Sequence, residues 1–549
     1  MASISGILST GAQGLFASQA ALQITSQNIA NVNTVGYSRQ RPTMESSPHG
    51  NGVRVTSIER LRDRYLDARL REALTEQGSL AKRSEILSRL ETFLDETNAM
   101  GPTQLLSDLF SSLHDLTLNP SGASEREMLR AKANSLAQAL NANSQRMDDM
   151  LADVEFQIRE TVNQINDYAQ QIAKLNAQAT YNHTTGRVSN ELVDQRDLLI
   201  EKMASLVQVQ KIDNPDGSVA VLVAGGMAIV DGITANELAV RRGDNALADL
   251  EVEFVAGKSM RLAVGNGLDR GQLGELLSMY RGRLSDIRDS MDRFAATLMQ
   301  RFNLAHQAGA GLDGVSGRDF FDGLEAYAAP AGPLTGGAVV TATGIASLSG
   351  MTMDQFEIRF TSATTFDVVN ASTGVVVSSG NAYNSGVPIA VSGMSITITD
   401  MGGGPKAGDT FRVNGFRGAA ARIEVAAAIQ NSIQAIAAGL TSAAGDNRNA
   451  LALAQLETMD IAPGGASTLS EYYTTILSNL GIAVNQSQIN ENRQDMIVEQ
   501  LKNFVQENSG VSVDEESVNL IQYQRAFEAS SRVISVANDM LDAILRLVG

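Results

Sequence analysis

The residue types that most often carry chemistry are sparse in this sequence. It contains no cysteine and four histidines, His49, His114, His183 and His306. None of the histidines stands at metal-ligand spacing from another histidine or a carboxylate, and no HExxH motif is present. We therefore predict that each histidine is a surface or capping residue. The absence of cysteine excludes disulfides, thiolate-bound zinc and thiol catalysis.

Two short motifs resemble ligand-binding loops but lack the required context. GAGLDG (309–314) has the letters of a dinucleotide-binding turn, yet it follows a predicted helix and opens none, which favours a plain loop. DNPDG (213–217) resembles a calcium loop only loosely, because its spacing is wrong and the distant glutamate is missing. Acid pairs such as Asp148–Asp149 are predicted to face solvent on helices. We therefore predict no enzymatic activity, no metal site and no cofactor.

The charge balance argues against nucleic acid as a partner. With 43 basic and 61 acidic residues, the formal net charge is −18, and an acidic surface repels phosphates. The one arginine-rich stretch, from Arg39 to Glu72, interleaves basic and acidic residues. We interpret it mainly as a solvated helical face with local ion pairs. The alternative is a docking surface for an acidic neighbour.

The usual targeting signals are also missing. No run of about 18 apolar residues occurs, so we expect no membrane insertion. The N-terminus lacks the basic region of a cleavable signal peptide, and by these signals alone a cytoplasmic protein is expected. A chain without cysteine, however, needs no redox step if it is made in one compartment and used in another.

The first 38 residues carry no charge, because the first charged residue is Arg39. Within them Leu8, Leu15, Leu22 and Ile29 recur every seven residues, which predicts a helix with one narrow apolar stripe. Several glycines make this helix weak on its own. Absence of charge suits a segment surrounded by protein, because burying an unpaired charge costs several kcal/mol. The alternative is an ordinary buried helix of a globular bundle.

The C-terminal end carries a matching pattern. A capping box of Ser512 and Glu515 is predicted to begin a helix there. Its apolar residues also recur every seven positions: Val513, Leu520, Phe527, Ile534 and Leu541. We expect the two terminal helices to pair with each other.

Between the ends, helical periodicity predicts helices at 58–97, 103–116, 124–180, 191–206, 271–307, 419–441 and 468–507. Alternation with period two predicts strands at about 207–264 and in 330–416, which is rich in Gly, Thr, Val and Ser. The predicted fold class is mainly α with an inserted β domain, in an elongated multi-domain chain.

Three domains are predicted. Residues 1–35 and 508–549 form a coiled-coil-like pair of terminal helices, the inner core. Residues 36–329 and 417–507 form a helical bundle, with the small β-rich part at 207–264. Residues 330–416 form the β-rich insertion at the far end.

Both ends carry motifs that resemble those of one family. SQNIANVNTVGYSRQ (26–40) is similar to the N-terminal motif of the bacterial flagellar rod, hook and hook-associated proteins. GVSVDEESVNLIQYQRAFEASSRVISVANDMLDAILRL (510–547) is similar to their C-terminal motif. The stretches at 191–207 and 273–303 resemble the hook-associated members, which join hook to filament. The resemblance covers roughly 1–325 and 420–549, and the insertion has no motif that we can match.

The resemblance implies a structural protein of the flagellum that joins hook to filament by helical self-assembly. Its implied partners are copies of itself, the hook protein, a second junction protein, an export chaperone and the flagellar type III export apparatus. Export without a cleavable signal peptide would place the protein outside the cell, in the flagellum, and would overturn the cytoplasmic expectation.

The resemblance also implies which residues pair the terminal helices and contact other subunits. Gly36 would supply a backbone conformation that a Cβ hinders. The whole predicted set is Leu8, Leu15, Leu22, Asn28, Ile29, Asn31, Gly36, Tyr37, Leu520, Tyr523, Gln524, Phe527, Val533, Ile534 and Leu541.

Two alternatives remain at the level of the sequence. One is a flagellar hook or distal rod subunit, against which the two central helical stretches argue. The other is a secreted adhesin or enzyme on a flagellar scaffold, with its activity in the insertion. Residues 330–416, however, contain no cluster of His, Asp or Glu.

Overall fold

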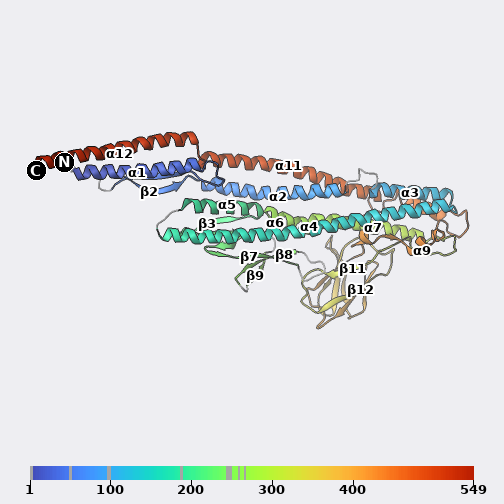
Figure 1. Cartoon of the computed structure of the whole chain (residues 1–549). Coiled ribbons are helices and arrows are strands. Elements are labelled where there is room, and N and C mark those ends of the chain that lie inside the picture. The colour runs from blue at the N-terminus through green and yellow to red at the C-terminus, as the bar shows by residue number, and fades with distance from the viewer. Residues whose placement is uncertain are drawn as a thin grey trace.

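The chain folds into an elongated, mainly helical molecule with both termini side by side at one end (Figure 1). The computed structural model describes residues 4–47, 52–94, 101–185, 189–242, 250–257, 260–264 and 267–548. One of the four histidines, His49, lies outside the described residues, so the prediction for it is not addressed. The inserted β domain projects sideways from the helices, toward the end opposite the termini.

The terminal helices α1 (Ile4–Ala30) and α12 (Val513–Val548) pack against each other in antiparallel directions (Figure 1). Their line of contact uses small residues. A Cβ added at Gly11 would lie 2.8 Å from Cγ1 of Ile534, closer than real Cβ contacts come. Glycine therefore lets the two backbones approach.

The apolar stripe predicted for α1 is not its most buried face. Leu8, Leu15, Leu22 and Ile29 are only half-buried. The fully buried positions lie mostly three residues further along or on the next turn: Gly11, Ala17, Ser18, Ala21, Ile24, Thr25 and Asn28. The predicted stripe therefore flanks the helix pair and keeps part of its apolar surface accessible.

One large hydrophobic core runs through the helical bundle. Its longest member is α4, 62 residues, which buries apolar residues spaced by three or four positions, such as Leu151, Val154 and Ile158. Helices α6 and α7 follow each other through a π turn at Met279–Arg283. The bundle helices are α2 (Arg64–Leu94), α3 (Pro102–Leu118), α4 (Ala123–Thr184), α5 (Asn190–Leu206), α6 (Gly271–Ser278), α7 (Leu284–Gln307), α8 (Ala419–Arg422), α9 (Ala427–Asn431), α10 (Arg448–Gln455) and α11 (Leu469–Ser509).

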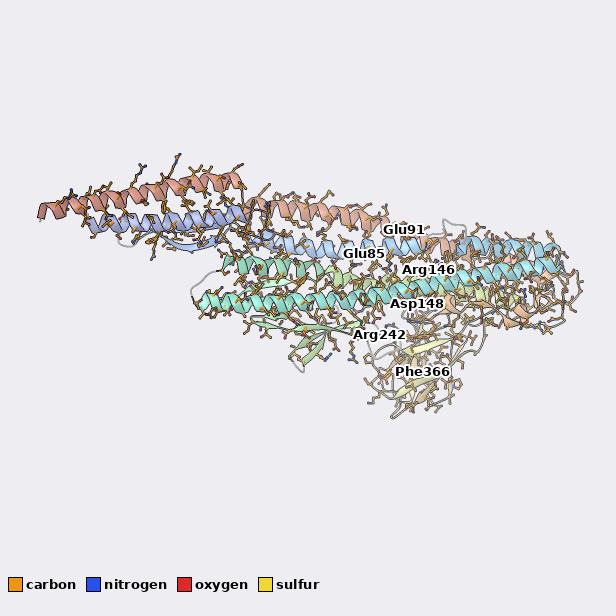
Figure 2. The ribbon with its side chains drawn as sticks, viewed as in Figure 1. Glu85, Glu91, Arg146, Asp148, Arg242 and Phe366 are labelled. Atoms are coloured by element: carbon orange, nitrogen blue, oxygen red, sulfur yellow. The ribbon has the colours of Figure 1, made fainter. Side chains whose placement is uncertain are left out.

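The strands outside the insertion form short antiparallel pairs and small sheets. A hairpin of β1 and β2 follows α1, and two small sheets lie beside α4, where Arg242 is seen in Figure 2. These strands are β1 (Gln40–Ser46), β2 (Val53–Arg60), β3 (Gln210–Asp213), β4 (Val219–Val223), β5 (Met227–Asp231), β6 (Thr234–Ala235), β7 (Glu237–Arg242), β8 (Leu250–Ala256), β9 (Met260–Ala263), β10 (Phe321–Asp322) and β19 (Glu424–Val425).

The insertion has a core of its own, formed by residues such as Ile358, Ile396 and Phe411. Its five-stranded sheet has the order β11-β18-β13-β14-β15, and its three-stranded sheet has the order β12-β17-β16. The strands are β11 (Tyr327–Pro330), β12 (Ala338–Ile345), β13 (Phe356–Phe360), β14 (Thr365–Asn370), β15 (Val376–Ala382), β16 (Pro388–Val391), β17 (Met394–Asp400) and β18 (Thr410–Asn414).

Two helix predictions were wrong. The helix predicted to begin at 58 begins at Arg64, because the residues before it pair with β1 as strand β2. The single helix predicted at 419–441 is broken into α8, β19, α9 and a 3-10 turn. There the backbone bonds to distant groups instead: Asp292 accepts from the Gly418 and Ala420 amides, and β19 pairs with β10. The sequence analysis also missed α10.

The surface or capping prediction was wrong for His306, which is only 1% exposed. Its Nδ1 lies 2.7 Å from the carbonyl oxygen of Arg318, and the Ala437 amide donates to its Nε2 at 2.9 Å. The ring is therefore a neutral bridge between two segments. The other two described histidines, His114 and His183, are exposed as predicted, and His114 contacts Glu457.

We predict that replacing His306 by glutamine changes how stability depends on pH. Burial lowers the pKa of His306 to about 4, below its ordinary value of 6.5. A lowered histidine pKa means that the folded state loses stability as pH falls from about 6.5 to about 4, by about 3 kcal/mol. The free energy of unfolding of wild type minus that of His306→Gln should fall by this amount between pH 7 and pH 4.

The difference between the two proteins is the quantity to measure, because Asp292 titrates in the opposite sense. Burial raises the pKa of Asp292 to about 6, so its contribution to stability rises as pH falls. That contribution is common to both proteins and cancels in the difference. A difference that stays constant between pH 7 and pH 4 would contradict the buried neutral bridge.

Candidate functional site

One buried asparagine, Asn28, fixes the end of α1 nearest the bundle through hydrogen bonds. Asn28 is 1% exposed, and its Oδ1 accepts from the Tyr37 hydroxyl at 2.9 Å and the Gln40 amide at 3.0 Å. Its Nδ2 donates to the Gln40 carbonyl at 2.9 Å and to Oε2 of Glu516 at 3.1 Å. One side chain thus joins α1, the segment after it and the start of α12.

Tyr37 is suited to donate to Asn28 at any ordinary pH. Burial, with the negative charges of Asp194 and Glu191, raises the pKa of Tyr37 to about 12. The phenol therefore stays neutral and keeps its proton for the hydrogen bond to Asn28.

The first charged residue of the chain binds the acidic start of the last helix. Arg39 donates to Oε1 of Glu516 at 2.7 Å and to Oε2 of Glu515 at 2.6 Å, and its amide donates to the Ser509 carbonyl at 2.9 Å. The Glu516 side chain is 3% exposed. The contact with Glu516 is buried and the one with Glu515 is exposed, and both are charge-assisted hydrogen bonds. The ends of α11, α1 and α12 therefore meet at Arg39.

This contact modifies the predicted capping box. The Glu515 amide does donate to Oγ of Ser512, at 3.4 Å. The Glu515 carboxylate, however, pairs with Arg39, since the guanidinium offers a charge-assisted bond.

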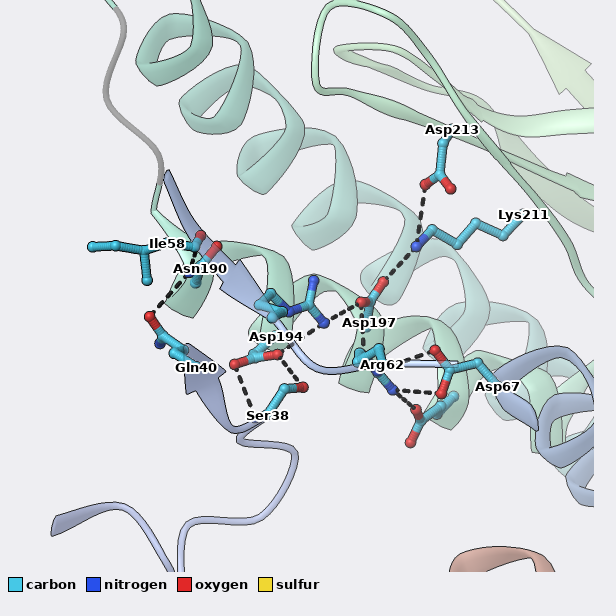
Figure 3. Close-up of polar contacts among 12 residues, drawn as sticks. Ser38, Gln40, Ile58, Arg62, Asp67, Asn190, Asp194, Asp197, Lys211 and Asp213 are labelled. Atoms are coloured by element: carbon cyan, nitrogen blue, oxygen red, sulfur yellow. Dashed lines mark hydrogen bonds and ion pairs between the residues drawn. The ribbon is translucent and has the colours of Figure 1, made fainter. Parts of the chain in front are cut away.

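A second group of contacts links the same segment to the bundle (Figure 3). Ser38 donates twice to Asp194 of α5, from its amide at 3.1 Å and its hydroxyl at 2.7 Å. The Asp197 carboxylate, one turn further, receives Arg60 at 2.7 Å, Arg62 at 2.8 Å and Lys211 at 2.7 Å. Although burial acts in the opposite sense, these cations hold the pKa of Asp197 well below its usual range.

The interpretation of the arginine-rich stretch was therefore wrong for at least three of its members, the first of which is Arg39, which pairs with Glu515 and Glu516 of α12. Arg60 and Arg62 do not lie on a solvated helical face, since their side chains are only 13% and 14% exposed. They pair with acids of α5 within the same chain. Arg69 and Glu72 do form an exposed local pair, as the sequence suggested.

The other predicted residues of the N-terminal end lie at the turn after α1. Gly36 has φ of +83°, a left-handed conformation that favours glycine, and a Cβ there would lie 3.3 Å from Leu198. The Asn31 side chain donates to the Gln27 carbonyl at 3.0 Å and accepts from Thr34 at 3.1 Å. Both residues shape the exit from α1.

The predicted residues of α12 divide into two groups by burial. Leu520, Tyr523, Phe527 and Ile534 are half-buried. Gln524, Val533 and Leu541 are exposed. Val533 nevertheless lies beside α1, since a Cβ at Gly11 would be 3.4 Å from its Cγ1.

Sequence reasoning missed most of the polar contacts that link the terminal helices to the bundle, which we call the joint. Its residues are Ser38, Arg39, Gln40, Arg60, Arg62, Asp194, Asp197, Lys211, Glu515 and Glu516. One signal could have found three of them, Arg39, Glu515 and Glu516. The first charge after the uncharged segment is basic, and the acids that begin the last helix are the matching charges at the other end of the sequence. No local pattern pairs Arg60 with Asp197.

The carboxylates of the joint form ion pairs with its arginines and its lysine. Among the described residues, no group of three or more His, Asp or Glu is placed to hold a metal ion. Over the same part of the chain, no helix combines the length and the apolar character needed to cross a bilayer.

Comparison with protein families finds three matches along the chain. Residues 87–321 match the flagellar hook-associated protein FlgK helical domain. Residues 8–37 match the flagella basal body rod protein family, and residues 503–547 match the flagellar basal body rod FlgEFG protein C-terminal family.

Full-length relatives and a solved structure agree with these matches. The chain is 29% identical to flagellar hook-associated protein 1 of Escherichia coli K12, over 99% of this chain and 100% of that protein. It is 26% identical to the protein of that name from Bacillus subtilis 168, over 99% and 98%. The structure of the flagellar hook junction protein FlgK from Burkholderia pseudomallei shares the fold, with a TM-score of 0.69 at 21% identity, over 81% of this chain and 100% of that one.

The helical domain matched at 87–321 belongs to a hook-associated protein, which argues against a hook or rod subunit. The motifs at the two ends, the central helical domain and the elongated fold all match those of flagellar hook-associated proteins. The chain belongs to the flagellar hook-associated protein 1 family and is a structural component of the bacterial flagellum.

Proposed function

We propose that this protein is the adaptor that joins hook to filament, and that its terminal helix pair is the part that assembles around the flagellar axis. The observation that carries the proposal is an uncharged helix paired with a helix that leaves much apolar surface open. On α12, Val518 is 64% exposed, Ile521 50%, Val536 51% and Met540 48%. On α1, Phe16 is 66% exposed.

Such surface is costly in water and is removed from it when copies pack together. The pair suits this environment because α1 brings no charge into the contact. Neutral serine, threonine and glutamine side chains can hydrogen-bond between subunits without the cost of burying an unpaired charge. The buried joint at Asn28 and Arg39 would hold the pair at a fixed angle to the bundle, so that inner and outer parts assemble in register.

The partners follow from this role. They are copies of the chain in a ring or helical turn, the hook protein on one side and the second junction protein on the other. The related protein from Burkholderia pseudomallei is described as a hook junction protein. An export chaperone and the flagellar type III apparatus would deliver the chain, uncleaved and unfolded, to the outside of the cell. The proposed role is structural and includes no catalysis.

The proposal predicts that Val536→Asp blocks assembly without unfolding the protein. Burying an unpaired carboxylate between subunits costs about 3 kcal/mol, a weakening of association of about a hundred-fold. The purified variant should keep the wild-type free energy of unfolding within about 0.5 kcal/mol, because the residue is exposed in the monomer. Cells should form hooks but few filaments, as counted by electron microscopy.

Val375→Asp is the matched control, since Val375 is 60% exposed but lies in the inserted β domain. Cells with this variant should carry filaments as wild-type cells do. Normal filament numbers in the Val536→Asp strain would count against assembly through α12.

A further inference from the structure

A cavity of about 620 Å³ lies between α2, the α6–α7 segment and α11. Its floor is apolar and includes Leu87, Ile476 and Leu480. Asn479 and Asn490 of α11, Arg283 of the π turn and Asp286 of α7 also line it, as does Glu275, whose carboxylate pairs with Arg83. An apolar floor with polar groups around it is typical of a binding site.

Two features show that the cavity is incomplete in the single chain. Ser487 is 2% exposed, and its hydroxyl has no hydrogen-bond partner in the part of the chain that the structure describes. Gly282 lies in the π turn, where a Cβ would meet nothing within 4 Å. A π turn in a helix often marks a functional site. The space above Gly282 is thus open to a group from elsewhere.

The surface beside the cavity suits a helix. On α11, Ile482, Ile489 and Met496 stand seven residues apart and are 68%, 52% and 64% exposed. Ala483 and Asn490, which follow the first two directly, line the cavity. Exposed apolar residues at this spacing are typical of a seam where another helix packs. A small ligand in the cavity would leave this seam uncovered.

A complementary surface lies on α4 of the same chain, on the other side of α2 (Figure 1). Phe156 of α4 is 66% exposed, and Glu160, one turn further, is exposed as well. Glu160 and Arg283 form no ion pair within the described residues, so each is available to a partner of opposite charge.

The two surfaces also lie at the same height along the bundle. Arg89 of α2 pairs with Asp153 of α4, and Lys82 donates to Gln157 at 3.3 Å. Arg83 and Leu87, on the same stretch of α2, line the cavity. Glu85 and Asp148 mark this region of α2 and α4 in Figure 2. Copies placed side by side at equal height would therefore bring Phe156 of one level with the cavity of the next.

We propose that the outer face of α4 of a second copy docks on this surface. Phe156 enters the cavity over its apolar floor, and Glu160 brings acceptor oxygens to the polar side, where Arg283 and the Ser487 hydroxyl lie. Because the two surfaces differ, each copy offers one to each neighbour, and a contact of this kind builds either a ring or a helical turn of copies. The proposal rests on the proposed function, and it names the contact that joins the bundles.

Cross-linking tests the contact directly, because the chain has no cysteine of its own. Full-length Gly282→Cys and Phe156→Cys chains are co-expressed in a strain that also makes the wild-type chain, so that flagella still form, and the flagella are isolated and mildly oxidised. We expect a disulfide-linked dimer when both chains are present and none with either chain alone. Absence of the dimer in flagella that carry filaments would overturn the proposal. The same result is expected if a small polar molecule, and not a second copy, occupies the cavity.

A second pair of variants tests whether the contact matters. Gly282→Leu places a side chain in the space that Phe156 would enter, whereas Gly344→Leu, in the inserted domain, adds the same side chain where a Cβ meets nothing within 4 Å. Removing a central aromatic contact typically weakens association by about thirty-fold. We expect Gly282→Leu to cause a comparable drop in filaments per cell, with the unfolding temperature of the monomer unchanged and Gly344→Leu like wild type.

Normal filament numbers with Gly282→Leu would overturn the docking but not the adaptor role. A deletion strain that keeps its filaments without any copy of the gene would contradict the adaptor role itself. The two failures are therefore distinguishable.

Discussion

Cells in which Gly11 is replaced by leucine are expected to be non-motile and to carry almost no filaments. At this position a Cβ alone would lie 2.8 Å from Cγ1 of Ile534 and 3.4 Å from the Ser530 carbonyl oxygen. Three further carbons cannot be placed unless α1 and α12 move apart. Overpacking of this kind costs about 1–3 kcal/mol, and α1 is too weak a helix to keep its place without its partner.

The loss should be confined to the terminal pair, because the main bundle core does not include α1. The thermal unfolding of the bundle should therefore stay as in wild type, while proteolysis of the N-terminal segment becomes faster. Gly344→Leu is the matched control, since a Cβ at Gly344 in the inserted domain would meet nothing within 4 Å. Normal swimming by the Gly11→Leu strain would show that the close crossing is not required.

The second large effect is expected at Asp197. Replacing it by alanine leaves Arg60, Arg62 and Lys211 without the carboxylate that all three contact. Removing one partner of a buried ion pair costs about 3–5 kcal/mol when the remaining charge is left unpaired. Here the cations keep other carboxylates, such as Asp194 for Arg60, so the lower end of that range, about 3 kcal/mol, applies. We expect the free energy of unfolding, measured with urea, to fall by about this amount, and the contacts between β2, α5 and β3 to loosen.

Asp213→Ala provides a matched control on the same lysine. Asp213 also contacts Lys211, at 3.2 Å, but its side chain is 46% exposed. An exposed ion pair contributes about 0–1 kcal/mol, so this variant should be close to wild type. Equal losses from the two variants would mean that burial of the Asp197 cluster does not determine its contribution.

The pH dependence of this site has a definite sign. The pKa of Asp197 is lowered in the folded protein, so its contribution is present above the ordinary aspartate pKa of 3.8 and is lost as pH falls toward the lowered value. The stability deficit of Asp197→Ala relative to wild type should therefore shrink below about pH 4.

Local patterns determined most of the secondary structure. The helical periodicity at 124–180, the seven-residue line of α12 and the alternation in the insertion each persist over many residues, and the structure has helix or strand at these places. Such repeats depend only on the geometry of a single helix or strand, so neighbouring residues are enough to show them. The motifs at the two ends were also readable, and they led to the family.

Where segments far apart in the sequence meet, only the tertiary structure decided the outcome. The buried face of α1 is its line of small residues, because α12 approaches most closely there, and the leucines that dominate the pattern lie on the flank. Arg60 and Arg62 are buried because α5, more than a hundred residues later, places Asp197 beside them. The helix predicted at 419–441 is broken because Asp292, His306 and β10 bind its backbone.

In each of these cases the residue type limits which contacts are possible, but the fold decides which contact is made. The sequence by itself determined the elements, the uncharged first helix and the family. The tertiary structure decided which face packs, which charges are buried and which apolar surface remains open for other subunits. Those choices depend on contacts between distant segments, whose energies outweigh local preference.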